Sequence, residues 1–121
     1  MQSRYFFSIP EGYQVAQFRY SATSNGSGVA TFAMDKWLSG RRHVGLCLTA
    51  AAAVTPFPYG TPFNDGKQIG AMAQQVVCPV NGTEPQPLLF DFPESSNPQW
   101  VVYGLANATA YVLHVYVLVQ L

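Results

Sequence analysis

The sequence predicts an all-β fold: a single antiparallel β-sandwich, jelly-roll-like, with seven or eight strands. Nine prolines and ten glycines interrupt the chain at short intervals. The segments between them are rich in Val, Tyr, Phe and Thr, residues that favour strands. A chain of 121 residues is the size of one domain, and it shows neither an internal repeat nor a linker. The sandwich is therefore expected to span residues 1–121.

The first half of the chain alternates between strand-like segments and turn signals. Residues 13–22 place apolar and wetter side chains on opposite faces, which is the period of a half-buried strand. The segment "SNGSG" at 24–28 is a turn signal that predicts a hairpin. The elements expected here are strands at 4–9, 13–22, 29–34 and 43–49, with one helical turn or a loop at 35–40.

Strict alternation divides the strand expected at 43–49 into two faces. It puts Val44, Leu46 and Leu48 on one face and His43 on the other.

The second half begins with a segment that argues against regular structure. "TPFPYGTPFNDG", at 55–66, has three prolines, so we expect an ordered loop there. Two interpretations remain open for residues 69–77: their apolar spacing fits a helix, whereas the proline and the Asn-Gly turn that follow favour a strand over 74–80. Further strands are expected at 87–92, 99–106 and 110–121.

The last strand, "AYVLHVYVLVQL", has one apolar face and one mixed face. Its odd positions, from Tyr111 to Leu121, are apolar or amphipathic and are expected to face the core. Its even positions combine apolar area with hydrogen-bonding tips, as subunit contacts do. Because a bare strand of this kind would aggregate, we expect it to be central in its sheet or covered by another copy of the chain. For the even face we favour another copy as the cover. The expected interface consists of Val112, His114, Tyr116, Leu118 and Gln120.

Low charge is the most informative property of the composition. Charged residues make up 10% of the chain, and the net charge is zero, against roughly 25% charged residues in an average soluble domain. A monomer normally covers its surface with charge, whereas interface cores are poor in charge and rich in aromatic residues. The composition therefore predicts a homo-oligomer.

The same composition disfavours catalysis and two classes of partner. Six carboxylates and two histidines form no catalytic or metal-binding motif, so we expect no enzyme activity, no cofactor and no metal. Arg41-Arg42-His43 is too small a basic cluster for nucleic-acid binding. Polar residues interrupt 99–121 too often for a membrane-spanning helix.

The N-terminal residues lack the apolar stretch and cleavage site of a secretory signal. Without export, the isolated Cys47 and Cys78 are expected to be buried free thiols rather than a disulfide. Asn25, Asn81 and Asn107 lie in glycosylation sequons, which we interpret for the same reason as turn sequences.

Aromatic residues in or beside loops indicate an alternative function. Trp37, Tyr59 and Trp100 could stack against sugar rings, as aromatic side chains do in carbohydrate-binding modules. Glycans are therefore a second candidate class of partner. The competing interpretation is that these rings plug the ends of the sandwich or line an interface.

The low-charge, proline- and glycine-punctuated chain, closed by "QWVVYGLANATAYVLHVYVLVQL", resembles small virion proteins. These are jelly-roll or sandwich domains that decorate phage capsids as trimers, or that form fibre and knob heads. The resemblance lies in the overall pattern, and no functional residue carries over. It implies a non-catalytic structural virion protein, assembled in the host cytoplasm as a homotrimer and bound to a capsid or fibre. Residues 1–9, with Tyr5, Phe6 and Phe7, are expected to form a docking arm.

Overall fold

The computed structural model describes residues 9–49, 58–69, 74–75 and 86–121. Within these ranges the chain forms nine strands, of which β5 and β6 have only two residues each, and one 3-10 helix, η1. The seven longer strands agree with the predicted count. The elements in chain order are β1 (Tyr13–Thr23), β2 (Ala30–Ala33), η1 (Lys36–Leu38), β3 (Arg42–Thr49), β4 (Tyr59–Asn64), β5 (Lys67–Gln68), β6 (Gln74–Gln75), β7 (Gln86–Asp91), β8 (Pro98–Tyr103) and β9 (Ala110–Gln120).

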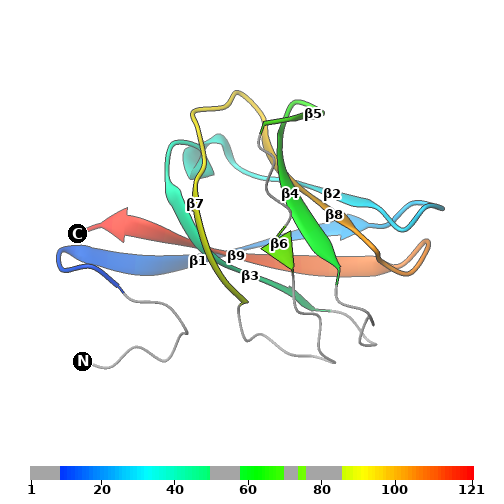
Figure 1. The fold of residues 1–121 in the computed structure, drawn as a ribbon, viewed down its shortest axis with the longest axis horizontal. Helices are drawn as coiled ribbons and strands as arrows, with labels where there is room; N and C mark the ends of the chain where they lie inside the picture. The colour runs from blue at the N-terminus through cyan, green and yellow to red at the C-terminus, as the bar shows by residue number, and fades with distance from the viewer. Residues whose placement is uncertain (1–8, 50–57, 70–73, 76–85) are drawn as a thin grey trace.

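The strands form the two sheets of an antiparallel β-sandwich, which confirms the predicted fold class (Figure 1). Sheet A has the strand order β1-β9-β3-β7. Sheet B has the order β2-β8-β4-β5, and β6 also pairs with β4. The two longest strands, β1 and β9, lie side by side in sheet A along the length of the molecule.

The strands pair in a nested series around one turn. β1 pairs with β9, β2 with β8, β3 with β7 and β4 with β6. In each pair the two partners lie almost equally far before and after Gly66, as Tyr13 and Gln120 do. At this centre Asp65 and Gly66 both have positive φ, 51° and 80°, which is the backbone of a type I′ turn between β4 and β5. A long hairpin rolled up in this way has the jelly-roll topology.

The core lies between the sheets and takes alternate positions from each strand. On β9, Tyr111, Leu113, Val115 and Val117 are at most 2% exposed and belong to the core, as predicted for the odd positions. Leu121 lies beyond the strand and is 78% exposed, so the prediction fails there. The buried residues that meet β9 from other segments are Ala30, Phe32, Met34, Leu38, Leu46, Leu48, Phe92, Trp100, Val102 and Leu105.

The predicted alternation on β3 is wrong at its start, because the strand contains a β-bulge. The register against β7 and β9 shifts between His43 and Gly45, so an extra residue is accommodated there. His43 is consequently directed into the core, whereas Val44 faces the outer side of sheet A. From Leu46 onward the alternation is as predicted. The outer side carries a small apolar cluster of Val15, Val44, Tyr116 and Leu118.

β4 lies in a segment that was predicted to be a loop. Its Pro62 is tolerated because of the direction in which the missing N–H would point. The Pro62 carbonyl accepts a hydrogen bond from the Ile69 N–H at 3.1 Å, beside β5. Since the N and O of one strand residue face the same neighbour, the ring nitrogen also faces that side. The ladder between β4 and β8 is therefore kept.

The turn between β1 and β2 docks on the connection between β8 and β9. Asn25 Oδ1 accepts hydrogen bonds from Ser27 N at 2.8 Å and from Val29 N at 3.1 Å, an Asx-turn arrangement. The Gly28 carbonyl accepts one from Leu105 N at 3.0 Å. Gly28 has a φ of 72°, and a Cβ there would overlap the Leu105 carbonyl oxygen. We call this end of the sandwich, residues 24–29 and 104–109, the neutral end, because it contains no charged residue.

Candidate functional site

The even-numbered face of β9 lies on the outer side of sheet A and is largely buried within a single chain. Its three central residues, His114, Tyr116 and Leu118, are only 4%, 2% and 8% exposed. The flanking residues differ, since Val112 is partly buried and Gln120 is exposed. The central residues therefore have little area left to bury against a second copy. Of the predicted interface, only the two flanking positions remain open to a partner.

His114 is held by two hydrogen bonds across sheet A. Gln17 Nε2 donates to its Nδ1 at 2.9 Å, and its Nε2 lies 2.8 Å from Thr49 Oγ1. Because an amide nitrogen only donates, Nδ1 is the acceptor, and the ring proton sits on Nε2 and is donated to Thr49. Burial lowers the pKa of His114, and the charge of Arg19 lowers it further. The ring is a neutral, hydrogen-bonded part of the sheet.

Trp100 is not available for sugar stacking, which corrects the prediction from sequence. It is fully buried, and its Nε1 donates to His43 Nδ1 at 3.1 Å. His43 in turn donates from Nε2 to the Leu38 carbonyl at 2.9 Å, and its ring stacks on Phe92 with centroids 4.9 Å apart. Trp100 faces inward because it alternates in phase with Val102, which is also in the core.

His43 is a neutral structural group of the core. Because Trp100 donates to Nδ1, the ring proton sits on Nε2, and both nitrogens are satisfied. Burial lowers the pKa of His43 to about 4. A buried histidine with two fixed partners serves packing, and it is not placed for acid–base chemistry.

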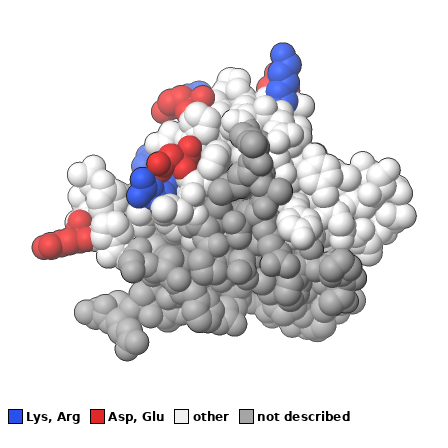
Figure 2. Space-filling view, in the orientation of Figure 1, with Lys and Arg blue, Asp and Glu red and all other residues white. Residues whose placement is uncertain are grey.

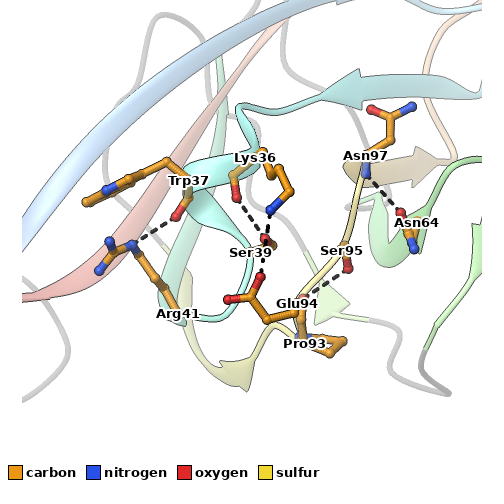
Figure 3. A network of polar contacts seen from close by, with 9 residues as sticks. All are labelled: Lys36, Trp37, Ser39, Arg41, Asn64, Pro93, Glu94, Ser95 and Asn97. Carbon is orange, nitrogen blue, oxygen red and sulfur yellow. Dashed lines mark hydrogen bonds and ion pairs between the residues drawn. The ribbon is translucent and has the colours of Figure 1, made fainter.

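Trp37 is 44% exposed, but one face of its ring is occupied. The guanidinium carbon of Arg41 lies 3.6 Å from the ring centroid, and Arg41 Nε donates to the Trp37 carbonyl at 2.8 Å (Figure 3). The ring of Phe18 also packs against it, with centroids 5.4 Å apart. Nearby, Lys36 and Glu94 form an ion pair at 4.0 Å (Figure 3). A sugar would have to compete with the cation–π contact for this ring.

The outer face of sheet B carries no charged side chain on β2, β8 or β4. Tyr59 is 50% exposed and lies opposite Tyr103, which is 39% exposed. The sequence prediction included Tyr59 and missed Tyr103, although alternation from the inward-facing Val102 would have found it. We call this surface the neutral face; by strand register it consists of Thr31, Ala33, Tyr59, Thr61, Phe63, Gln99, Val101 and Tyr103. Thr61 and Val101, in its middle, are buried, at 7% and 5% exposed, so the area open to a partner comes from the other members.

All four strands of sheet A end around a hollow of about 390 Å³, at the end of the sheet opposite the neutral end. It is lined by the first residues of β1 and β3, Tyr13 and Arg42, and by the last residues of β7 and β9, Asp91 and Gln120. We call this hollow at the strand ends the corner hollow, and polar side chains from distant parts of the sequence converge there. Arg41 also lines a second hollow, together with Trp37 and Glu94 among others.

Arg42 and Asp91 form a two-pronged ion pair at the corner hollow. The distances are 2.7 Å from Nε to Oδ1 and 3.1 Å from Nη2 to Oδ2, and the residues lie directly opposite each other on β3 and β7. The hydrogen bond from Arg42 lowers the pKa of Asp91, and the same contact raises the pKa of Arg42. Their side chains are 45% and 71% exposed, so water screens the pair and its contribution to stability is small.

Several predicted residues lie outside the described ranges. They include the docking-arm residues Tyr5, Phe6 and Phe7, and also Cys78 and Asn81. Most of the segment with two open interpretations, 69–77, lies outside as well, apart from Ile69 and the short β6. Cys47, on β3, is fully buried.

The part of the chain that the structure describes contains no group of three or more His, Cys, Asp or Glu side chains that could hold a metal ion. In the same part, every buried side-chain nitrogen and oxygen has a hydrogen-bond partner. No helix within the described ranges is long and apolar enough to cross a membrane. No model of a known protein family matches this chain, and no curated protein matches its sequence.

Proposed function

We propose that this chain is a non-catalytic structural protein of a virus particle, which associates with itself as a trimer and attaches to a capsid or fibre. The distribution of charge carries this proposal. Apart from Arg19 on β1, the described charged side chains lie near the corner hollow, at η1 and at the β4–β5 turn. The described atoms at the right of Figure 2, which include the neutral end, show no charge.

The neutral face is the surface best suited to contact another copy. It combines two half-exposed tyrosines with the exposed Thr31 and Ala33 and the partly buried Phe63 and Gln99. Interface cores are depleted of charge and enriched in tyrosine. When a surface contacts a copy of itself, its charged groups can face groups of the same sign and repel them. A surface without charge avoids this repulsion.

The jelly-roll topology supports assignment to a particle. Domains with this topology build viral capsids, and they also occur in lectins and cupins. The fold alone does not assign a function, so the particle role rests on the resemblance of the whole chain together with its neutral surfaces. Assembly in the host cytoplasm is part of the same proposal.

Light scattering on the purified protein tests self-association, with the mass of a trimer as the expected result. Tyr103→Lys places a charge on the neutral face, and we expect it to weaken association about tenfold or more. Ser21→Lys adds the same charge at an exposed site on β1 and serves as the matched control. A strictly monomeric wild type contradicts the proposal. Equal weakening by both variants rules out the neutral face as the contact.

A further inference from the structure

The corner hollow gathers side chains that suit different parts of one small ligand. Arg41 and Arg42 donate hydrogen bonds, Asp91 accepts them, and Gln120 does both. Tyr13, which is 40% exposed, adds an aromatic ring. These groups come from β1, β3, β7, β9 and the turn before β3, so the fold assembles them at one corner.

The polar groups of the corner hollow keep binding capacity beyond their contacts within the protein. Arg42 uses Nε and Nη2 for Asp91, and Arg41 uses Nε for the Trp37 carbonyl. A guanidinium has five N–H donors, so both arginines retain donors. A carboxylate has about four lone-pair sites, of which Arg42 fills two. Asp91 can therefore still accept hydrogen bonds from a ligand.

The charges of the corner hollow match a ligand with one negative charge. Two guanidinium groups and one carboxylate line it, and the carboxylate is already paired with Arg42. The positive charge that is not paired with a carboxylate belongs to Arg41. A carboxylate on the ligand fits beside Arg41, in the two-pronged geometry that guanidinium groups favour.

The acceptor Asp91 restricts the ligand further. A bare anion such as acetate or phosphate gains nothing from this carboxylate and is repelled by it. A ligand that also carries hydroxyl groups can donate to it. The volume of about 390 Å³ lies near the lower limit for ligand pockets, roughly 300–1,000 Å³. Tyr13, with Leu118 on the same face, offers apolar contact to a ring.

We propose that the corner hollow binds an acidic sugar, a pyranose ring that bears one carboxylate and free hydroxyl groups. Arg41 holds the carboxylate, Asp91 and Gln120 take the hydroxyls, and Tyr13 packs against the C–H face of the ring. This site is on sheet A, away from the neutral face of sheet B, so it does not depend on the proposed self-association.

NMR titration with three probes tests the proposal. D-glucuronate carries the ring and the carboxylate, D-glucose has the ring alone, and acetate has the carboxylate alone. We expect D-glucuronate to bind with a Kd on the order of 1 mM, and about tenfold more tightly than either other probe. The amide shifts are expected to centre on Tyr13, Arg42 and Gln120.

Two variants and one control assign the roles. Arg41→Gln is expected to reduce the affinity for D-glucuronate to that for D-glucose, because only the carboxylate contact is lost. Asp91→Asn is expected to weaken both sugars about tenfold. Arg19→Gln removes an equal charge from exposed β1 and leaves binding unchanged. Thermal melting shows that each variant is folded.

Three outcomes overturn the proposal. One is the absence of binding by D-glucuronate at roughly 50 mM, well above the expected Kd. Another is acetate binding as tightly as D-glucuronate, which would indicate an anion site without sugar specificity. The third is an equal loss in Arg19→Gln and Arg41→Gln, which would indicate attraction by overall charge. A monomeric protein that still binds D-glucuronate would contradict the proposed self-association alone.

Discussion

The outer faces of the two sheets differ although both sheets cover the same core. On sheet A the outer face holds Tyr116 at 2% exposure beside the hydrogen-bonded His114, within a single chain. On sheet B the corresponding face leaves Tyr59 and Tyr103 half-exposed on strands without charge. The middle of both faces is buried, since Thr61 and Val101 on sheet B are only 7% and 5% exposed, but only sheet B leaves tyrosine rings open to solvent, at the ends of its strands. The overall composition cannot distinguish the two, but strand register can.

Truncating one tyrosine on each outer face is the most direct test of this difference in burial. Tyr116→Ala removes a buried ring and is expected to lower the free energy of unfolding by about 3 kcal/mol. Tyr103→Ala removes a half-exposed ring, with an expected loss of about 1 kcal/mol or less. Urea unfolding at pH 7 and low protein concentration measures both. Equal losses would contradict the distinction between a buried and an open outer face.

Lowering the pH tests the inner and outer faces of sheet A, because His43 lies on the inner face and His114 on the outer face. The folded protein holds His43 neutral and lowers its pKa from 6.5 to about 4. Below pH 6.5 the unfolded chain binds a proton that the folded chain does not, so stability falls as the pH falls from 6.5 to 4. The loss from this group is about 3 kcal/mol and is complete near pH 4. Above pH 6.5 it contributes no pH dependence.

His114 acts in the same direction, since burial lowers its pKa too. Urea unfolding at pH 7 and at pH 4.5, with His114→Gln as the comparison, separates the two histidines. The variant is expected to keep most of the loss in acid, because His43 is the more deeply buried. A profile that is flat between these pH values would rule out a neutral, buried His43.

Gly28 tests how firmly the two sheets are joined at the neutral end. Gly28→Ala combines an unfavourable positive φ with overlap of the Leu105 carbonyl oxygen, and we expect a loss of about 2 kcal/mol. Gly26→Ala, in the same turn, meets no atom within 4 Å and has no positive φ. It is therefore expected to change stability little. Thermal or urea unfolding measures both, and similar effects would show that the docked turn is not required.

The fold class could be predicted from sequence because alternation is a local property. The odd positions from Tyr111 to Val119 face the core as predicted, and the Asn25 segment forms the predicted turn. Two errors came from features that alternation does not record. The bulge at His43 reverses which residues face inward at the start of β3, and Pro62 is accepted where its ring nitrogen faces away from β8. A third error was the prediction that Trp100 is exposed for sugar stacking. It rested on the nearby loop, whereas alternation along β8 places the ring in the core.

The corner hollow could not be predicted because it depends on the pairing of distant strands. Arg42 and Asp91 are 49 residues apart, and they meet only because β3 and β7 are neighbours in the rolled hairpin. Tyr13 and Gln120 are brought opposite each other by the outermost pair. No spacing between these residues in the sequence indicates their contact.

The nested pairing around Gly66 has a consequence for folding kinetics. The β4–β5 hairpin closes the shortest loop, and each pair formed outward from it leaves only a short loop for the next to close. We therefore expect folding to begin near Asp65 and Gly66 and to end with β1 and β9. The strand ends around the corner hollow come from the β3–β7 pair and from the outermost pair, β1 and β9, so the hollow is complete only when that last pair has formed. Ligand binding at that corner would then report the final step of folding, because the site does not exist until the roll has closed.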